Sequence, residues 1–249
     1  MQSIVTMIAG VPAAPGAPVV PAGNIKPLYP GRPESGAVEH WLLGSSSASL
    51  VGLKGVRSLV PVASAPTFEA DHAILANGVN GLRTGIADSV EYTLALVLRL
   101  DNEAGGTGKV LGGTSGSSSL DAKGVLIAQN VSNSIGVTPR PHASATPFAT
   151  DQLTPAIGQF VFLCLSVQAQ NVTTFLGRVG RVSRAVASPI VVSDRQIAVG
   201  NAYYSGATFQ SGIRVAEAIV WPSALNADQV EAVYARSQQR AMERGMVLY

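Results

Sequence analysis

Aromatic and amide side chains gather in one short segment, residues 201–210, which reads Asn-Ala-Tyr-Tyr-Ser-Gly-Ala-Thr-Phe-Gln. Sugars are held in shallow sites where aromatic faces contact the ring and amides bond to its hydroxyls. Tyr203, Tyr204 and Phe209 could supply such faces, with Asn201 and Gln210 as polar ends. We therefore predict a glycan contact at this loop. The alternative is that the three rings pack onto the edge of the domain or onto a neighbouring subunit.

A glycine-rich segment, residues 105–109, has the sequence Gly-Gly-Thr-Gly-Lys and partly matches a phosphate-binding loop. Such a loop has a further glycine five residues before its last glycine and a serine or threonine directly after the lysine. This chain has Glu103 and Val110 at those two positions. The segment is therefore interpreted as the glycine-rich tip of a hairpin.

The remaining reactive side chains form no catalytic or metal-binding pattern. Cys164 lies in an apolar run that predicts a buried strand, whereas a catalytic thiol needs exposure and a nearby base. His40, His72 and His142 are far apart and show no metal-ligand spacing. Oxygen ligands for calcium exist but make no recognisable loop: Asp88, Asp101, Asn102, Glu103 and Asp121. No metal and no cofactor is predicted.

The composition favours one large all-β domain with tails. The chain has 249 residues, of which 47% are hydrophobic and 13% charged, and a net charge of +2. A surface so poor in charge is typical of proteins that pack against copies of themselves or in a larger assembly. The near-neutral balance gives no electrostatic footprint for nucleic acid. No apolar run is long enough to cross a membrane, and the start lacks the basic region of a signal peptide.

Prolines recur with a period of three in residues 1–33, with Asn24 at the one skipped position. A polyproline II helix has three residues per turn, so these rings would line one edge of an extended rod. We predict an arm that lies along a neighbouring subunit or a scaffold, and the alternative is a stiff linker or disordered tail. The arm prolines are Pro12, Pro15, Pro18, Pro21, Pro27, Pro30 and Pro33.

Two predicted strands flank the aromatic loop, at residues 197–199 and 213–221. Alternation in the second strand predicts Ile213, Val215, Ile219 and Trp221 on one face. Proline cannot donate to a ladder, so the strand should end before Pro222.

A helix should follow, because Asn226 and Gln229 form a capping-box pattern. It would place Val230, Val233 and Tyr234 on one side. Three arginines spaced by four residues then predict a solvent-exposed basic stripe, and the alternative is contact with acidic groups on a neighbour. They are Arg236, Arg240 and Arg244.

Earlier segments also alternate as strands do. Residues 92–99 place Tyr92 and Leu94 on one face and Thr93 and Ala95 on the other, and residues 160–167 are apolar on both faces. Residues 38–43 look like an opening strand, and residues 138–154 like a long surface loop. Regular turns and one late helix indicate a sandwich or jelly roll.

The end of the chain resembles the closing segment of concanavalin A-like, laminin-G-like jelly rolls, and the resemblance covers roughly residues 34–238. It implies an all-β, two-sheet antiparallel jelly-roll sandwich with an extended N-terminal arm and a short C-terminal helix. The expected divisions are an arm at 1–33, the jelly roll at 34–225, and a helix and tail at 226–249. The matching residues are Gly212, Ile213, Ala216, Glu217, Ile219, Val220, Trp221, Ala224, Leu225, Gln229, Val233 and Tyr234.

Glycanases of this fold carry a Glu-x-Asp strand followed closely by a second glutamate, because retaining cleavage needs two carboxylates about 5 Å apart. Glu69 and Asp71 match the first part of that pattern. The residues that follow are His-Ala-Ile-Leu, so the second glutamate is missing. We therefore expect no enzyme.

Modules that resemble this one occur in bacteriophage tail fibres, tail tips and capsid decorations, and in bacterial surface proteins. Together with the low charge and the predicted arm, the resemblance implies a structural virion protein that is made in the host cytoplasm. Its partners would be other virion subunits and further copies of itself, and its jelly roll would touch host-surface glycan. The alternatives are a free carbohydrate-binding lectin and, less favoured, a glycan-cleaving enzyme.

Overall fold

The structure is a computed structural model that describes residues 33–101, 107–116, 123–139, 149–186 and 188–249. The chain divides into two units, Met1–Arg32 and Pro33–Tyr249, of which the second contains all the described residues. The predicted arm, with Pro12, Pro15, Pro18, Pro21, Pro27 and Pro30, lies outside the described residues. Pro33 belongs to the second unit, where it opens the 3-10 helix η2 (Pro33–Gly36).

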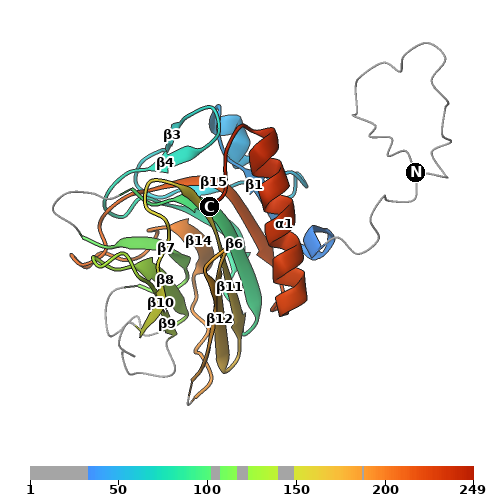
Figure 1. Cartoon of the computed structure of the whole chain (residues 1–249). Coiled ribbons are helices and arrows are strands. Elements are labelled where there is room, and N and C mark those ends of the chain that lie inside the picture. The colour runs from blue at the N-terminus through green and yellow to red at the C-terminus, as the bar shows by residue number, and fades with distance from the viewer. Residues whose placement is uncertain (1–32, 102–106, 117–122, 140–148, 187) are drawn as a thin grey trace, which may run out of the picture. The chain divides into compact units, whose positions relative to one another are not determined.

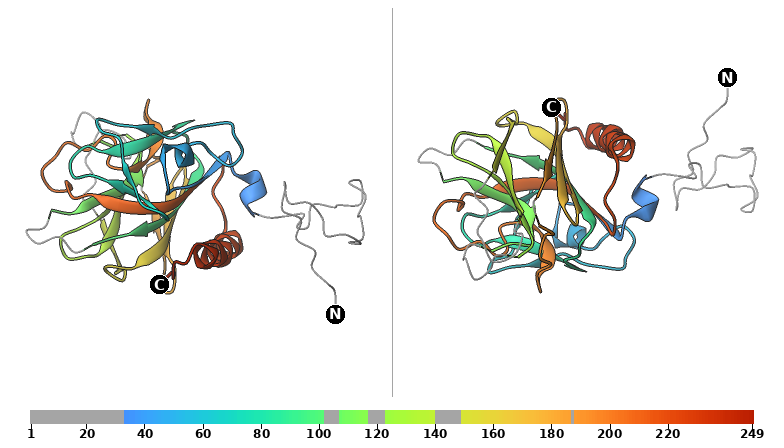
Figure 2. Two further views of the ribbon diagram at one scale, coloured as in Figure 1. Left: turned by 90° about the horizontal axis from the view of Figure 1, so that it is seen from above. Right: turned by 90° about the horizontal axis from the view of Figure 1, so that it is seen from below.

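The second unit is built from two antiparallel sheets stacked face to face, with helix α1 (Ala227–Glu243) against the outer face of one of them (Figures 1 and 2). We call that one the helix-bearing sheet and the other the opposite sheet. The predicted two-sheet jelly roll with a short C-terminal helix is thereby confirmed.

The helix-bearing sheet has the strand order β13-β12-β11-β6-β15-β4-β3, and β1 also pairs with β15. Its strands are β1 (Glu39–Leu42), β3 (Thr67–Phe68), β4 (Ala73–Leu75), β6 (Tyr92–Arg99), β11 (Phe160–Gln168), β12 (Asn171–Leu176), β13 (Gly180–Ala185) and β15 (Ile213–Trp221).

The opposite sheet has the order β10-β9-β8-β7-β14-β5-β2. Its strands are β2 (Val60–Pro61), β5 (Gly81–Ala87), β7 (Lys109–Gly113), β8 (Val125–Gln129), β9 (Ile135–Pro139), β10 (Ala149–Leu153) and β14 (Gln196–Gly200). A second 3-10 helix, η3 (Ser47–Leu50), lies between β1 and β2.

The helix-bearing sheet is buried on both faces where α1 covers it, which explains its continuous apolar strands. In β6, Leu94 and Leu96 point into the core between the sheets, while Ala95 and Val97 belong to the cluster under α1. β11 follows the same rule, with Val161 and Leu163 inside and Phe162 and Cys164 outside. The predicted alternation of these two strands is confirmed.

The prediction that Ile213, Val215, Ile219 and Trp221 lie on one face of β15 is wrong, because these residues lie on both faces. The pairing of β15 with β6 shifts register between Val215 and Glu217. A bulge of this kind inserts one extra residue, so the side chains after it swap faces. Ile213 and Val215 therefore lie in the core between the sheets, whereas Ile219 and Trp221 lie under α1.

The predicted surface loop at residues 138–154 also needs correction. It contains the end of β9 and all of β10, which pair with each other at the edge of the opposite sheet. Residues 140–148 between them lie outside the described residues. Two further strands, β5 and β13, were not predicted, because glycine and arginine interrupt their apolar pattern.

Helix α1 begins as predicted. The Asn226 side chain accepts from the Gln229 backbone N–H at 3.0 Å, and the Gln229 side chain accepts from the Asn226 N–H at 2.9 Å. Val230, Val233 and Tyr234 are buried against the sheet. Tyr234 lies 5.3 Å from Phe162 and 5.7 Å from Phe175 between ring centroids.

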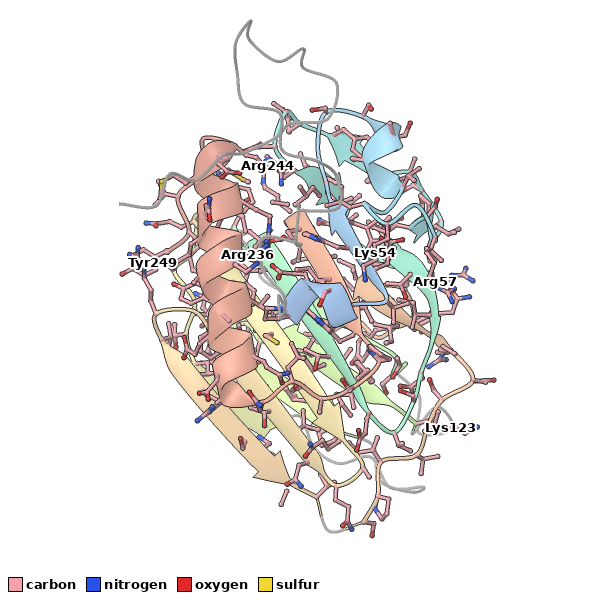
Figure 3. All side chains as sticks on the ribbon, turned by 90° about the vertical axis from the view of Figure 1, so that its right-hand side faces the viewer. Lys54, Arg57, Lys123, Arg236, Arg244 and Tyr249 are labelled. Atoms are coloured by element: carbon pink, nitrogen blue, oxygen red, sulfur yellow. The ribbon has the colours of Figure 1, made fainter. Side chains whose placement is uncertain are left out.

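The arginine stripe of α1 does not face solvent, which corrects the prediction. Arg236 and Arg240 both form ion pairs with Glu34 of η2, at 2.6 and 2.7 Å. Arg240 also pairs with Glu217 of β15 at 2.6 Å. Figure 3 shows Arg236 and Arg244 on the side of α1 that faces η2. The acidic partners belong to the same chain, so the stripe fastens the helix to its own sheet.

The cluster formed by Glu34, Glu217 and the two arginines also fixes the start of the domain. Pro33 accepts a hydrogen bond from the Trp221 indole N–H at 2.6 Å, next to the Glu34 pairs. His40 Nε2 lies 2.6 Å from Glu217. Burial alone would raise the pKa of Glu217, but the His40 hydrogen bond and the Arg240 charge outweigh burial and lower it. Burial likewise opposes the ionisation of Glu34, and the bonds from Arg236 and Arg240 lower its pKa.

Acid should weaken the domain through these two glutamates. A lowered folded-state pKa gives stability that is present above the unfolded value of 4.5 and is lost as pH falls through the folded value. Arg240→Met breaks a buried pair and should reduce the free energy of unfolding by about 3 kcal/mol at neutral pH. The difference from wild type should shrink in acid, where the glutamates are protonated.

Urea unfolding as a function of pH measures both effects. Burial raises the pKa of Asp88, so its effect on the pH dependence of stability is opposite to that of the two glutamates. Asp88 does not contact Arg240, and the wild type and the Arg240→Met variant share it, so it does not alter the difference between them. Glu231→Gln, on the exposed side of α1, is the matched control and should leave stability nearly unchanged. A loss for Arg240→Met that is the same at every pH would contradict the ion-pair explanation.

Candidate functional site

The predicted glycan loop joins β14 to β15. The side chain of Asn201 makes its hydrogen bonds to the backbone of this loop and of Gly78. The amide N–H groups of this buried residue donate to three backbone carbonyls, those of Gly78 at 2.9 Å, Tyr204 at 2.9 Å and Phe209 at 3.3 Å. Its carbonyl oxygen accepts from the Tyr204 backbone N–H at 2.9 Å. Asn201 therefore holds the two ends of the loop together.

The other four loop residues divide into buried and half-exposed ones. Phe209 is 6% exposed and packs on Val110, with Tyr204 edge-on at 5.4 Å between centroids. The Gln210 amide donates to the carbonyls of Tyr204 and Gly206. Tyr203 donates its hydroxyl to Gln196, and the Arg195 guanidinium lies over its ring at 5.0 Å. Tyr203 and Tyr204 stay half-exposed, so glycan contact by this loop stays a prediction that rests on them.

The loop should depend on Asn201 for stability. Asn201→Ala removes a buried amide and leaves three carbonyls without their donor, which should reduce the free energy of unfolding by about 2–3 kcal/mol. Tyr203→Phe deletes only a partly exposed hydroxyl and should cost less than about 1 kcal/mol. Urea unfolding of the two variants side by side checks this. Equal losses would show that the amide does not organise the loop.

The other reactive residues have structural partners. Asp71 lies 2.7 Å from Nδ1 of His72, whose Nε2 lies 3.4 Å from Arg214. Asp101 pairs with Arg99 and Arg214. Asp88 accepts from the backbone N–H of Ser193 at 2.8 Å.

No nucleophile, metal centre or membrane helix stands out in the described chain. Cys164 is 1% exposed, and burial raises the pKa of its thiol far above the usual range. Among the described residues, no group of three or more histidine, cysteine, aspartate or glutamate side chains could hold a metal ion. No helix there has the length and hydropathy to cross a bilayer. Asn102, Glu103, Asp121 and His142 lie outside the described residues.

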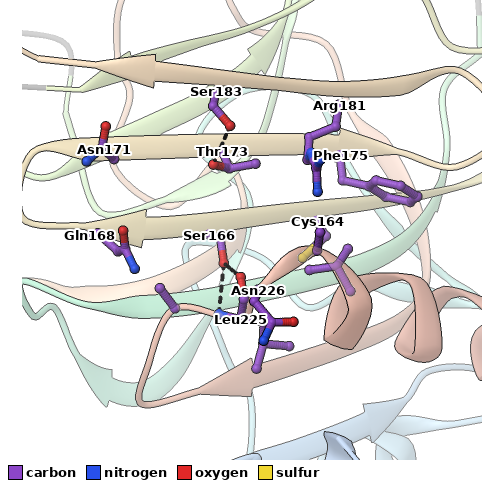
Figure 4. Close-up of a pocket in the computed structure, with 13 residues that line it drawn as sticks. Cys164, Ser166, Gln168, Asn171, Thr173, Phe175, Arg181, Ser183, Leu225 and Asn226 are labelled. Atoms are coloured by element: carbon purple, nitrogen blue, oxygen red, sulfur yellow. Dashed lines mark hydrogen bonds between the residues drawn. The ribbon is translucent and has the colours of Figure 1, made fainter.

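A polar groove lies instead on the outer face of the helix-bearing sheet, over β11, β12 and β13 (Figure 4). Its cavity volume is about 240 Å³. The pairing registers place its side chains in three cross-strand rows. The rows are Cys164–Phe175–Arg181, Ser166–Thr173–Ser183 and Gln168–Asn171–Ala185.

The start of helix α1 forms one wall of this groove. Residues 224–227 and Val230 line it beside β11. The Ser166 hydroxyl lies 2.8 Å from that of Thr93, and both accept from the Leu225 backbone N–H, at 3.0 and 2.9 Å. The wall is therefore fixed to the floor by hydrogen bonds, and the groove is formed before any ligand arrives.

Three side chains in the groove are available to a ligand. Within the described part of the chain, Gln168, Asn171 and Arg181 make no side-chain hydrogen bond or ion pair. The hydroxyls of Thr173 and Ser183 lie 2.9 Å apart and bond to each other, with no other side-chain hydrogen bond to a described residue. Directly opposed residues have Cβ atoms about 5 Å apart, so the amides and hydroxyls form a regular polar floor. Such a floor can exchange hydrogen bonds with a ligand rich in hydroxyl groups.

Sequence reasoning missed this groove because each strand contributes only two or three ordinary polar residues. The sequence did contain one signal, the alternation of polar residues with buried ones along a strand. Ser166 and Gln168 alternate with buried apolar residues in β11, and Asn171 and Thr173 alternate with buried residues in β12. That pattern indicates an outward polar face. It does not say which strands lie side by side, and pairing alone creates the rows.

No family model and no curated protein matches the chain. Solved structures do resemble it. Trypanosoma rangeli sialidase in complex with sialic acid has a TM-score of 0.59 at 15% identity, covering 88% of this chain and 35% of that one. The receptor binding domain of botulinum neurotoxin D has a TM-score of 0.62 at 9% identity, covering 84% and 54%. That of botulinum neurotoxin type G has a TM-score of 0.58 at 12% identity, covering 81% and 51%.

The chain spans between about a third and about half the length of these three proteins. At such low identity the likeness concerns the fold alone, a β-sandwich consistent with a concanavalin A-like jelly roll. One of these neighbours is solved in complex with sialic acid, and the other two are receptor binding domains of toxins.

Proposed function

We propose that this chain is a non-enzymatic structural component of a bacteriophage virion whose jelly roll binds host-surface glycan through the outer groove of the helix-bearing sheet. One observation carries the glycan part: a preformed polar groove whose amides at Gln168 and Asn171 have no partner in the described chain. The half-exposed rings of Tyr203 and Tyr204 are a second, separate candidate contact.

The groove suits a saccharide better than an apolar ligand. Each amide side chain can donate to one sugar hydroxyl and accept from another, as sugars require. Thr173 and Ser183 add two hydroxyls, and they can exchange their mutual bond for bonds to a ligand. The apolar surface in the groove is limited to residues such as Phe175, Leu225 and Val230. Hydrogen bonds between the groove and the sugar hydroxyls would therefore determine which saccharide the groove binds.

The groove gives no support to glycan cleavage. Retaining hydrolysis uses a pair of carboxylates about 5 Å apart, and sialidases use a tyrosine as nucleophile. The described groove lining contains no aspartate, glutamate or tyrosine. Asp71, the carboxylate that matched a glycanase pattern in sequence, pairs with His72 instead. We therefore infer a binding role without chemistry.

The virion part rests on the sequence. The charge content of 13% and the three-residue proline period of the arm suit a subunit held by neighbours. Pro33 and Glu34 are fixed by Trp221, Arg236 and Arg240, so a pull on the arm would be transmitted to helix α1 and the sheet.

A glycan array probed with the full chain tests the binding role. The double variant Gln168→Ala with Asn171→Ala should lose most of the signal, because the floor then lacks both amides. Tyr203→Ala with Tyr204→Ala is the matched comparison and reports on the loop. Loss in the loop variant alone would move the site to the loop. Absence of any glycan signal for the wild-type chain would overturn the binding role, and release of sugar would overturn the non-enzymatic one.

Truncation of the arm tests the assembly role. Deletion of residues 1–32 should abolish incorporation into phage particles, measured by immunoblotting of purified particles, while the domain stays folded by circular dichroism. Pro33 is kept because its carbonyl accepts from Trp221. Normal incorporation of the folded, truncated chain would contradict the arm, and glycan binding by a chain that never enters particles would favour the free lectin.

A further inference from the structure

We propose that the outer groove takes an acidic oligosaccharide, whose oxyanion is bound by Arg181 while its hydroxyls are bound at the opposite end by Gln168 and Asn171. This inference rests on the proposed glycan-binding function and names the ligand class for it.

Arg181 comes from the edge strand β13 and enters the groove along the first cross-strand row. Its register partner is Phe175, whose own partner is Cys164. Figure 4 shows the guanidinium turned inward along this row, toward Cys164. Both of those neighbours are buried and uncharged, so the cation lies over the apolar end of the floor. An anion held there would meet no competing charge from the floor.

The charge of Arg181 is not used within the described chain. Arg99 and Arg214 pair with Asp101, and Arg236 and Arg240 pair with Glu34. Arg181 makes no hydrogen bond or ion pair to any described residue, and the described groove lining holds no carboxylate. A guanidinium presents parallel N–H donors that match a carboxylate or sulfate in bidentate geometry. The groove therefore offers an anion subsite that the protein itself leaves open.

The length of the groove excludes a single sugar as the full ligand. Arg181 lies in the first row and Asn171 in the third, four strand residues apart. At about 3.4 Å per residue, these two rows are about 14 Å apart along the strand. One acidic monosaccharide cannot reach both ends, so simultaneous contact with the cation and the amides requires a chain of at least two sugars.

The full chain, titrated with matched oligosaccharides that carry carboxylates, sulfates or no charge, provides the test. Arg181→Gln keeps a polar hydrogen-bonding side chain, although a shorter one, and removes its charge. It should weaken binding of acidic oligosaccharides about tenfold or more and leave neutral ones unchanged. Arg181→Lys should restore part of the affinity, and the acidic ligands should bind more weakly as salt rises. The carboxylated and sulfated arms identify which oxyanion is preferred.

Arg83→Gln is the matched control, because Arg83 is an exposed arginine on β5 of the opposite sheet. It should change nothing, and urea midpoints should confirm that both variants are folded. If Arg181→Gln behaves like Arg83→Gln while the double amide variant loses binding, this inference fails and the proposed function stands. If the wild-type chain binds only neutral glycans, the inference also fails. If the wild-type chain binds no glycan, both this inference and the proposed glycan-binding role are wrong.

Discussion

The β-bulge in β15 is the constraint on which the rest of the domain depends. It lets one strand serve two cores: Val215, Ala218 and Val220 fill the space between the sheets, while Ile219 and Trp221 face helix α1. Without the shift, the strand would present its large side chains to one face and leave the other without them. The shift also places Glu217 under the helix, where Arg240 can reach it at 2.6 Å.

The position of the groove follows from how the helix is held. The ion pairs of Arg236 and Arg240 with Glu34 and Glu217 dock α1 over β15, and the ring contacts of Tyr234 continue the packing toward β11 and β12. The helix leaves uncovered the part of the sheet formed by the outer rows of β11, β12 and β13. There the side chains change from apolar to polar, since they meet solvent. The groove is the boundary between the covered and the uncovered face.

Local patterns predicted the local structure well. The alternation of β6 and β11 and the capping box at Asn226 each depend on neighbours within a few residues, and the structure agrees. What failed depends on distant partners. A bulge is set by the strand opposite, and the arginines of α1 are explained by Glu34, about two hundred residues earlier. The groove rows join three strands, so no single segment of sequence could show them.

The loop and the groove differ in how their polar groups are used, and this difference favours the groove as the proposed binding site. In the loop, the amides of Asn201 and Gln210 already bond to backbone carbonyls, so a ligand would have to break those bonds before making its own. In the groove, Gln168, Asn171 and Arg181 have no partner in the described chain and exchange only water for a ligand. Their backbone ladder keeps them in register, which lowers the entropy lost on binding. We therefore expect the loop, chosen for its composition, to be the weaker binder and the plain sheet face to be the stronger one.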